Sequence, residues 1–240
     1  MVLAAGIGAR LAPLTHLRPK ALCPVGGVPL VDRALDALGA LGLDVAVNAH
    51  HHAAALVAHV DGRAHVSEEP RLLGTAGALG ALRGWLDGRD ALVVNADAVH
   101  AADLTRLLAA DRGRVALLVA DPEGTPFGPA LRLCAARLPW ADVAMLEPEP
   151  SGLYDRLWVP AAREGRLDVL GGEVPWFDCG TPASYLAANL WCSGGEPVVG
   201  EGARVEGRLT RSVVWDGAHV RAGEHLVDAI RADGVTVLVR

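Results

Sequence analysis

Apolar residues form two alternating patterns along the first 194 residues. Short, mostly apolar runs that are typical of buried strands occur at 2–5, 44–48, 91–94 and 115–119. Between them, apolar residues recur every three or four positions, as on one face of a helix, at 29–41, 53–59, 79–86, 104–108, 154–162 and 182–191. Strands that alternate with helices predict an α/β domain. The proline-rich stretch 122–150 shows neither pattern, and no element is predicted there.

A different period begins after the Gly194-Gly195 pair. Aliphatic residues then stand six positions apart, in two runs formed by Val199 and Val205 and by Val214, Val220 and Leu226. A six-residue period predicts hexapeptide turns of a parallel β-helix with the four valines facing inward. A pair of irregular hairpins is the alternative.

The two patterns divide the chain into two parts. We expect a main domain at residues 1–194 and a hexapeptide-repeat β-helix tail at 195–240. The exposed edge of so short a tail could pair with a second copy of the chain, so we expect a homo-oligomer formed through the tail.

Composition and charge narrow the class of protein. The formal net charge is −6 and there is no basic run, which gives no support to a nucleic-acid surface. Apolar residues make up 51% of the chain, enough for a substantial core. No apolar stretch reaches the ~18 residues that a membrane span needs, so no membrane partner is expected. The four cysteines are scattered without CxxC spacing, which favours a reducing compartment, and we expect a cytoplasmic protein.

A glycine loop follows the first strand. Gly6 and Gly8 lack a Cβ atom, so backbone N–H groups there can approach an anion closely. A dinucleotide fingerprint would need a third glycine where Leu11 stands and an acid about 20 residues further on, yet no Asp or Glu precedes Asp32. The loop therefore predicts a phosphate site flanked only by cations: Arg10, Arg18 and Lys20.

Lys20 is the one lysine among 22 basic residues. In a chain that otherwise uses arginine, a lysine is expected to persist where arginine cannot serve. An ammonium is a compact point charge, whereas a guanidinium is a planar fork, and a crowded phosphate site can require the former. The alternative is a surface lysine retained by chance.

Two aspartates stand where a metal site is expected. Asp97 follows the apolar strand 91–94, and open α/β sheets place ligand crevices at the carboxyl ends of their strands. A carboxylate there is a credible Mg²⁺ ligand, although it could equally cap a helix. Asp178 precedes a helix for which Thr181-Pro182 already provides the N-cap and the first residue, so its carboxylate is free to bind a metal.

Two further segments have simpler interpretations. Gly74-Thr75-Ala76-Gly77 precedes a predicted helix, where two glycines permit the close approach of a flat ligand such as a base, but an ordinary loop-to-helix turn explains them as well. The consecutive histidines 50–52 would point to opposite faces of a strand, which argues against a metal cluster.

The sequence offers no support for nucleophilic catalysis, since it contains no Gly-x-Ser-x-Gly motif and no Cys/His pairing.

Together these segments resemble the sugar-1-phosphate nucleotidyltransferases, or NDP-sugar pyrophosphorylases. The opening signature of that family, L-A-A-G-x-G-x-R-L-x-P-L-T-x-x-x-P-K, is matched at every fixed position by residues 3–20. Further matches follow in the family's order at 73–79 (LGTAGAL), 93–97 (VVNAD), 178–185 (DCGTPxxY) and 212–220 (SVVWDGAHV). The LGTAGAL segment is most similar to that of mannose-1-phosphate and heptose-1-phosphate guanylyltransferases.

The resemblance implies a fold, an activity and a set of site residues. The fold would be a Rossmann-like, doubly wound mixed sheet with a short left-handed β-helix tail. The activity would be transfer of a nucleotidyl group from a nucleoside triphosphate, with GTP favoured, to a sugar 1-phosphate, with Mg²⁺ as cofactor and pyrophosphate as the second product. The implied catalytic residues are Arg10 and Lys20, and the implied Mg²⁺ ligands are Asp97 and Asp178. The implied nucleotide contacts are Leu3, Ala4, Ala5, Gly6, Gly8, Arg10, Gly74, Thr75, Ala76, Gly77 and Asn95.

The chain departs from the family pattern in the part that would bind the sugar. Ala96 replaces the usual glycine before the metal aspartate, and the usual Asn-Ala-Gly segment is missing. The Glu-Lys-Pro lysine that contacts the sugar phosphate cannot be present, because Lys20 is the only lysine. Arg132 or Arg137 could supply that cation instead.

These departures leave three alternatives open. One is a cytidylyltransferase for a small phosphorylated alcohol or phosphonate. Another is a non-catalytic, regulatory subunit that binds nucleotide sugars. The third is a protein that acts chiefly in assembly through its hexapeptide tail.

Overall fold

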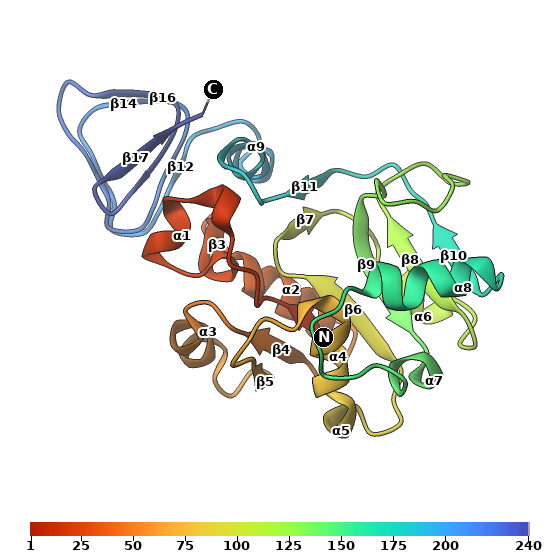
Figure 1. Cartoon of the computed structure of the whole chain (residues 1–240). Helices are drawn as coiled ribbons and strands as arrows, with labels where there is room; N and C mark the ends of the chain where they lie inside the picture. Colours follow the sequence, from red (N-terminus) through yellow and green to blue (C-terminus); the bar gives the residue numbers. More distant parts are fainter. Residues whose placement is uncertain (240) are drawn as a thin grey trace.

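A computed structural model describes residues 1–239. Its centre is a seven-stranded sheet in the order β10-β8-β9-β6-β1-β4-β5 (Figure 1). The strands are β1 (Val2–Leu3), β4 (Ala46–Ala49), β5 (His65–Glu68), β6 (Ala91–Asn95), β8 (Val115–Val119), β9 (Leu133–Leu138) and β10 (Leu167–Leu170). Neighbouring strands are parallel except at β9, which runs antiparallel to both β6 and β8. This mixed α/β sheet is the one that the resemblance implied.

Helices cover both faces of the sheet because alternate residues of each buried strand point to opposite sides. On one face, Val93 and Leu117 share a core with α4 (Gly74–Ala81), α5 (Arg83–Leu86), α7 (Trp140–Val143) and α8 (Val159–Arg163), which a π-helical turn, η3 (Tyr154–Trp158), precedes. On the other face, Val94 and Leu118 share a core with α2 (Leu30–Gly39), α3 (Ala53–Val60) and α6 (Thr105–Ala109).

The strand β9 lies in the stretch for which the sequence predicted no element. Its six residues are Leu-Cys-Ala-Ala-Arg-Leu, which form neither a continuous aliphatic run nor a regular alternation. Five of them are nevertheless buried, because β9 is inserted between β6 and β8 with helices on both faces. The short strands β5 and β10 were also missed, and the helix expected at 79–86 is instead two helices, α4 and α5.

Several short segments lie outside the central sheet. They are η1 (Ala9–Leu11), α1 (Leu14–Leu17), η2 (Lys20–Leu22), β2 (Pro24–Val25), β3 (Val28–Pro29), β7 (Ala98–His100), β11 (Trp176–Asp178) and α9 (Pro182–Cys192). β7 pairs antiparallel with β11, and β2 pairs with β3. No helix among the described residues is long and apolar enough to cross a membrane.

The tail coils beside α9 and α1 (Figure 1, blue). Its strands are β12 (Val198–Val199), β13 (Arg204–Val205), β14 (Arg208–Val214), β15 (His219–Val220), β16 (His225–Ala232) and β17 (Val235–Leu238). Each turn of the tail, here called a pass, pairs in parallel with the next one. The parallel pairs are β12 with β14, β14 with β16, and β13 with β15. β17 then returns antiparallel to β16. Parallel passes are what stacked coils require and are incompatible with two hairpins over 199–226. The hand of the coil stays a prediction.

The expected inward valines divide into two pairs. Val214 and Val220 are buried, at 1% and 0% exposure, but Val199 and Val205 are 49% and 36% exposed. For the second pair the prediction of burial was wrong. Each exposed valine pairs in register with a buried valine of the next pass, so it belongs to the first pass of the coil, which has a neighbouring pass on one side only.

Candidate active site

The glycine loop crosses the carboxyl end of the sheet directly after β1. At its start, the Ala4 amide donates to the Asn48 side-chain oxygen at 2.7 Å. At its end, Gly8 has φ +68°, and a Cβ atom there would lie 2.8 Å from the Thr15 Cγ2 atom and 3.1 Å from the Lys20 Cβ atom. Only glycine satisfies both the left-handed backbone and this close packing. Gly6 has open space around it, as a loop that receives a ligand requires.

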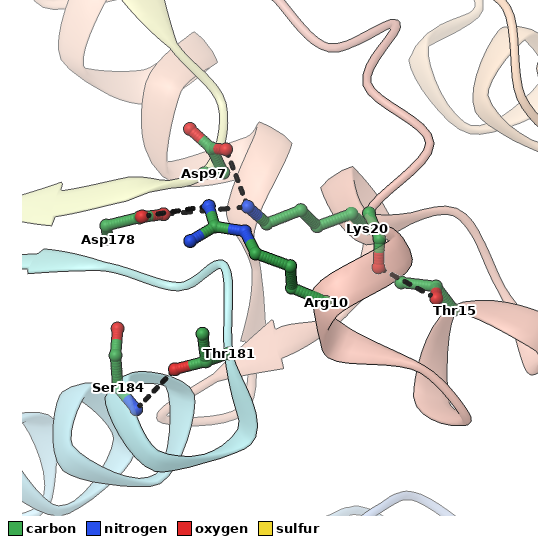
Figure 2. Close-up of polar contacts among 8 residues, drawn as sticks. Arg10, Thr15, Lys20, Asp97, Asp178, Thr181 and Ser184 are labelled. Carbon is green, nitrogen blue, oxygen red and sulfur yellow. Dashed lines mark hydrogen bonds and ion pairs between the residues drawn. The ribbon is translucent and has the colours of Figure 1, made fainter.

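Lys20 lies under this loop, in η2, and is only 7% exposed. Its Nζ atom is 2.6 Å from Asp97 Oδ2 and 3.7 Å from Asp178 Oδ1. The Arg10 guanidinium is 3.3 Å from the other Asp178 oxygen, and its side chain is 70% exposed. Figure 2 shows the two cationic side chains converging on the two carboxylates. The site therefore holds one buried and one exposed cation around a pair of acids.

Asp97 and Asp178 meet although they are far apart in sequence. Asp97 lies in the turn between β6 and β7, and Asp178 ends β11, where it pairs with Ala98. The Cys179 amide donates to the Asp97 carbonyl at 2.9 Å. Backbone pairing thus fixes the two acids side by side, independently of their side-chain contacts.

Neither acid serves as a helix cap. A strand, β7, follows Asp97, so the capping alternative for this residue does not apply. The N-cap of α9 is Thr181, whose side chain accepts from the Ser184 amide at 3.3 Å (Figure 2). Pro182 is the first helical residue. Helix capping therefore occupies neither carboxylate, and their partners are the two cations of the site.

The acid pair fits Mg²⁺ by its chemistry. Hard oxygen donors are what this ion prefers, and it usually takes one or two carboxylates and completes its shell with phosphate and water. The Asp97 and Asp178 side chains are 40% and 39% exposed, so both are accessible to a ligand. Across residues 1–239 there is no cluster of three or more His, Cys, Asp or Glu side chains that could hold a metal alone.

Cysteines near this site are not nucleophiles. Burial raises the pKa of the Cys179 thiol, which adjoins Asp178, to about 12. Burial likewise raises the pKa of the Cys23 thiol to about 12, against smaller opposing effects of Arg18 and Lys20. Both remain protonated near neutral pH, so the chemistry of the site belongs to its charged groups.

The glycines of 74–77 have a packing role in the structure. A Cβ atom on Gly74 would lie 2.5 Å from the Ser151 carbonyl oxygen, and one on Gly77 would overlap the Glu149 carbonyl. The Thr75 hydroxyl accepts from the Leu153 amide at 2.8 Å, and the Ala76 amide donates to Ser151. The close approach that these glycines permit is thus made by the chain's own backbone. Contact with a base stays a prediction.

The remaining predicted nucleotide contacts lie at the same edge of the sheet. Leu3 pairs with Asn95 across β1 and β6, and Ala4 and Ala5 continue from Leu3 into the glycine loop. Asn95 also lines a cavity of about 370 Å³ together with His100 and Trp191.

The proposed replacements for the missing sugar-phosphate lysine are not confirmed. Arg137 pairs with Leu92, toward the amino end of β6, whereas Asp97 lies beyond its carboxyl end. Its buried guanidinium instead lies 3.6 Å from Asp90, so for Arg137 the hypothesis was wrong. Arg132 precedes β9 at the correct edge, but its guanidinium binds the Asp121 carboxylate at 2.9 Å.

A buried polar pair escaped the sequence analysis. Asn48 and Glu69 are 3% and 4% exposed, and the Asn48 amide donates to Glu69 at 2.7 Å. Glu69 also accepts from the Leu73 amide at 2.8 Å, while Asn48 accepts from Ala4. The pair therefore ties the glycine loop to the start of the LGTAGAL segment. A polar residue ending a predicted strand, as Asn48 does, was the available signal.

Solved structures share this fold. A protein from Thermus thermophilus, titled mannose-1-phosphate geranyltransferase, superposes with a TM-score of 0.72 at 19% identity, over 99% of this chain and 93% of that one. At this identity the likeness shows the fold alone.

The family follows from sequence comparison. The profile of the MobA-like NTP transferase domain matches residues 1–188, and the chain belongs to this family. It is 32% identical, over 228 aligned positions, to N-acetylmuramate α-1-phosphate uridylyltransferase from Caulobacter vibrioides, covering 79% of this chain and 94% of that protein. It is 28% identical to mannose-1-phosphate guanylyltransferase from Mycobacterium tuberculosis, covering 99% of this chain and 80% of that protein. The chain is a nucleotidyltransferase.

Proposed function

We propose that the protein transfers a nucleotidyl group from a nucleoside triphosphate to a sugar 1-phosphate in the presence of Mg²⁺. The observation that carries this proposal is the placement of Lys20 between Asp97 and Asp178, directly under the glycine loop. In the reaction, an oxygen of the sugar phosphate attacks the α-phosphorus. The bond from that phosphorus to the bridging oxygen breaks, and pyrophosphate leaves with the electron pair.

The residues of the chain would align and neutralise two anionic reactants. Backbone N–H groups of the glycine loop, together with exposed Arg10, bind the β- and γ-phosphates. Lys20 places its ammonium against the α-phosphate, where negative charge is redistributed during transfer. Asp97 and Asp178 would hold Mg²⁺, which would supply positive charge to the phosphate oxygens. Preorganised charge of this kind is the main contribution that a protein makes to phosphoryl-group chemistry.

Similarity to named relatives gives two candidate donor nucleotides. The LGTAGAL segment favours GTP as donor, in keeping with the name of the 28% identical relative. UTP is the second candidate, because the 32% identical relative is a uridylyltransferase named for N-acetylmuramate 1-phosphate.

A pyrophosphate-release screen tests the function. The purified chain is incubated with Mg²⁺ and each of the four ribonucleoside triphosphates and dTTP, against mannose 1-phosphate, N-acetylmuramate 1-phosphate and glucose 1-phosphate. We expect release above that of an Asp97→Asn variant for at least one pair, and loss of release with EDTA. Absence of turnover with every pair, combined with tight nucleotide-sugar binding in calorimetry, would instead support the regulatory class.

For the tail we propose a left-handed β-helix that mediates homo-oligomer formation. The parallel pairing of its passes and the two exposed valines of the first pass support this assignment.

A further inference from the structure

One residue of the tail contacts the segment that carries the catalytic-site lysine. Trp215 directly follows β14 and is 1% exposed. The Arg18 guanidinium carbon lies 4.3 Å from the centroid of its ring, and Arg18 stands two residues before Lys20. Within residues 1–239, Arg18 is in no ion pair with a carboxylate. The indole face is thus a favourable contact for the Arg18 cation.

Two successive hydrogen bonds connect the same tryptophan to the residues that follow Lys20 in sequence. The Trp215 indole N–H donates to the Tyr185 hydroxyl at 3.0 Å. Tyr185, in α9, is fully buried, and its hydroxyl donates in turn to the Pro24 carbonyl. Pro24 stands four residues after Lys20. Contacts that originate at Trp215 therefore hold the segment 18–24 at both ends.

Apolar packing joins the same three parts of the molecule. Trp215 and Tyr185 belong to one buried cluster with Leu14 and Cys23 of the lysine-bearing region and with Cys179, next to Asp178. The interior of the coil is a separate cluster, formed by Val214, Ala218, Val220, Leu226 and Ala229. Because the clusters are distinct, the support of the segment 18–24 can be tested separately from the stability of the coil.

We propose that Trp215 is a positioning residue for Lys20, and that the tail therefore helps to set the geometry of the active site. This inference rests on the proposed role of Lys20 in nucleotidyl transfer. Misplacement of a catalytic group by ~1 Å can cost ~10²-fold in rate, so contacts that hold both ends of its segment affect turnover without touching the substrate. Loss of those contacts lowers kcat and leaves binding of the triphosphate to the glycine loop largely intact.

Amide hydrogen exchange tests the positioning without reference to activity. We expect Trp215→Leu to speed exchange in 18–24 by about 10-fold or more, as a local loss of stability does, while exchange in β16 stays as in the wild type. Tyr185→Phe, which keeps the ring and removes the hydroxyl, and Trp215→Phe, which keeps an aromatic ring and removes the indole N–H, should have smaller effects in the same segment. Val220→Ala is the matched control, because it removes a side chain from the coil interior only.

Steady-state kinetics completes the test. With the best substrate pair, Trp215→Leu should lower kcat by up to ~10²-fold with little change in KM for the triphosphate, and Val220→Ala should change neither. In a Lys20→Arg background, Trp215→Leu should have little further effect, because both changes act on one group.

Each result has a distinct meaning. Unchanged exchange in 18–24 in all three variants, or an equal increase in Val220→Ala, overturns the inference. Faster exchange in 18–24 with unchanged kcat also overturns the inference, because the segment then loosens without displacing a catalytic group. The role of Lys20 itself is decided separately, by turnover of Lys20→Arg. If Trp215→Leu does not fold, the two phenylalanine variants decide by the same criteria.

Discussion

At the scale of single residues, the environment of Lys20 explains why an arginine-rich chain keeps one lysine. Its side chain is buried, its Cβ atom lies close to the space where a Gly8 side chain would be, and its Nζ atom is shared by two carboxylates. A guanidinium is wider than an ammonium and distributes its charge over a plane. The room available thus favours the smaller cation.

We predict that Lys20→Arg lowers kcat by about 10²-fold while the melting temperature changes by only a few degrees. The positive charge is retained, so long-range attraction of the triphosphate survives, and the loss comes from misplacement of that charge. Turnover and thermal unfolding of the same preparation measure the two effects. Arg10→Lys, at a 70% exposed side chain, is the control and should be milder.

Near-normal turnover of Lys20→Arg with its best substrate pair would remove the catalytic role of Lys20. A large fall in melting temperature would instead identify the residue as structural.

The cysteines give a second prediction at this scale. Burial raises the pKa of Cys23, Cys134 and Cys179 to about 12 each, so at pH 8 their thiols are protonated and inaccessible. Cys192 alone is partly exposed. Iodoacetamide at pH 8 should therefore add one label to the native protein and four in denaturant, as counted by intact mass. Rapid labelling of Cys179 in the native state would show that the turn after Asp178 opens.

At the scale of elements, close backbone contacts hold α4 against the segment 147–151. The helix needs glycine at Gly74, Gly77 and Gly80. At these positions Ser151, Glu149 and Glu147 approach too closely for a Cβ atom. In the structure, the glycines of the 74–77 segment thus serve helix packing, and their contact with a base stays a prediction.

We predict that Gly77→Ala destabilises the protein by about 1–3 kcal/mol, since the added methyl group would overlap the Glu149 carbonyl. Gly84, in α5, has open space at its Cβ position, so Gly84→Ala is the matched control and should stabilise by roughly 0.5–1 kcal/mol through helix propensity. Urea unfolding of both variants measures the difference. A raised KM for the triphosphate in Gly77→Ala without loss of stability would favour base contact instead.

An ion pair between neighbouring strands makes stability depend on pH. The Arg114 guanidinium on the β8 side donates to both carboxylate oxygens of Asp168 in β10, at 2.8 and 2.7 Å. This hydrogen bonding is the main cause that lowers the pKa of Asp168 below its ordinary value. A carboxyl whose pKa is depressed by folding contributes stability above its unfolded pKa of about 3.9 and loses that contribution as the pH falls through its folded pKa.

Asp168→Asn should therefore be less stable than the wild type at pH 7, with the difference shrinking as the pH falls below ~4. Melting temperatures between pH 3 and pH 7 test this. Parallel curves for the two proteins over the whole range would contradict it.

At the scale of the whole molecule, the tail and the main domain share a core. The cluster around Tyr185 and Trp215 joins α9, the lysine-bearing region and the side of the coil that faces α9, so residues after 194 pack against the main domain. The first pass of the coil carries the exposed Val199 and Val205, and β17 forms an edge of its sheet. Association with a second copy of the chain would cover both the exposed apolar residues and the unpaired strand edge.

We predict a dimer through the first pass of the tail. Light scattering of the purified chain should give about twice the 24.9 kDa of one copy, and Val199→Asp should shift the mass toward that of the monomer. Leu108, in α6 of the main domain, is 44% exposed, so Leu108→Asp is the matched control and should leave the mass unchanged. A monomer at working concentrations would remove the dimer and leave the proposed catalytic function untouched.

Local patterns in the sequence determined the α/β class, most of the helices, the glycine loop, and the candidate roles of Lys20, Asp97 and Asp178. These features depend on neighbouring residues: a helical or strand period, a left-handed glycine, or a polar residue at the end of an apolar run. Strand β9 was missed because its burial comes from the strands on either side of it and not from its own composition. For the same reason the sequence could not reject Arg137, whose distance from Asp97 depends on the direction in which β9 runs.

Contacts between distant segments were decided only by the tertiary structure. The pairing of β7 with β11 joins two acids 81 positions apart, and Trp215 meets Arg18 across most of the chain. Local patterns alone predict neither contact, because the meeting of two distant segments depends on how the chain between them folds. The sequence alone thus determined the chemical groups of the site, while the fold decided which of them meet and what holds them in place.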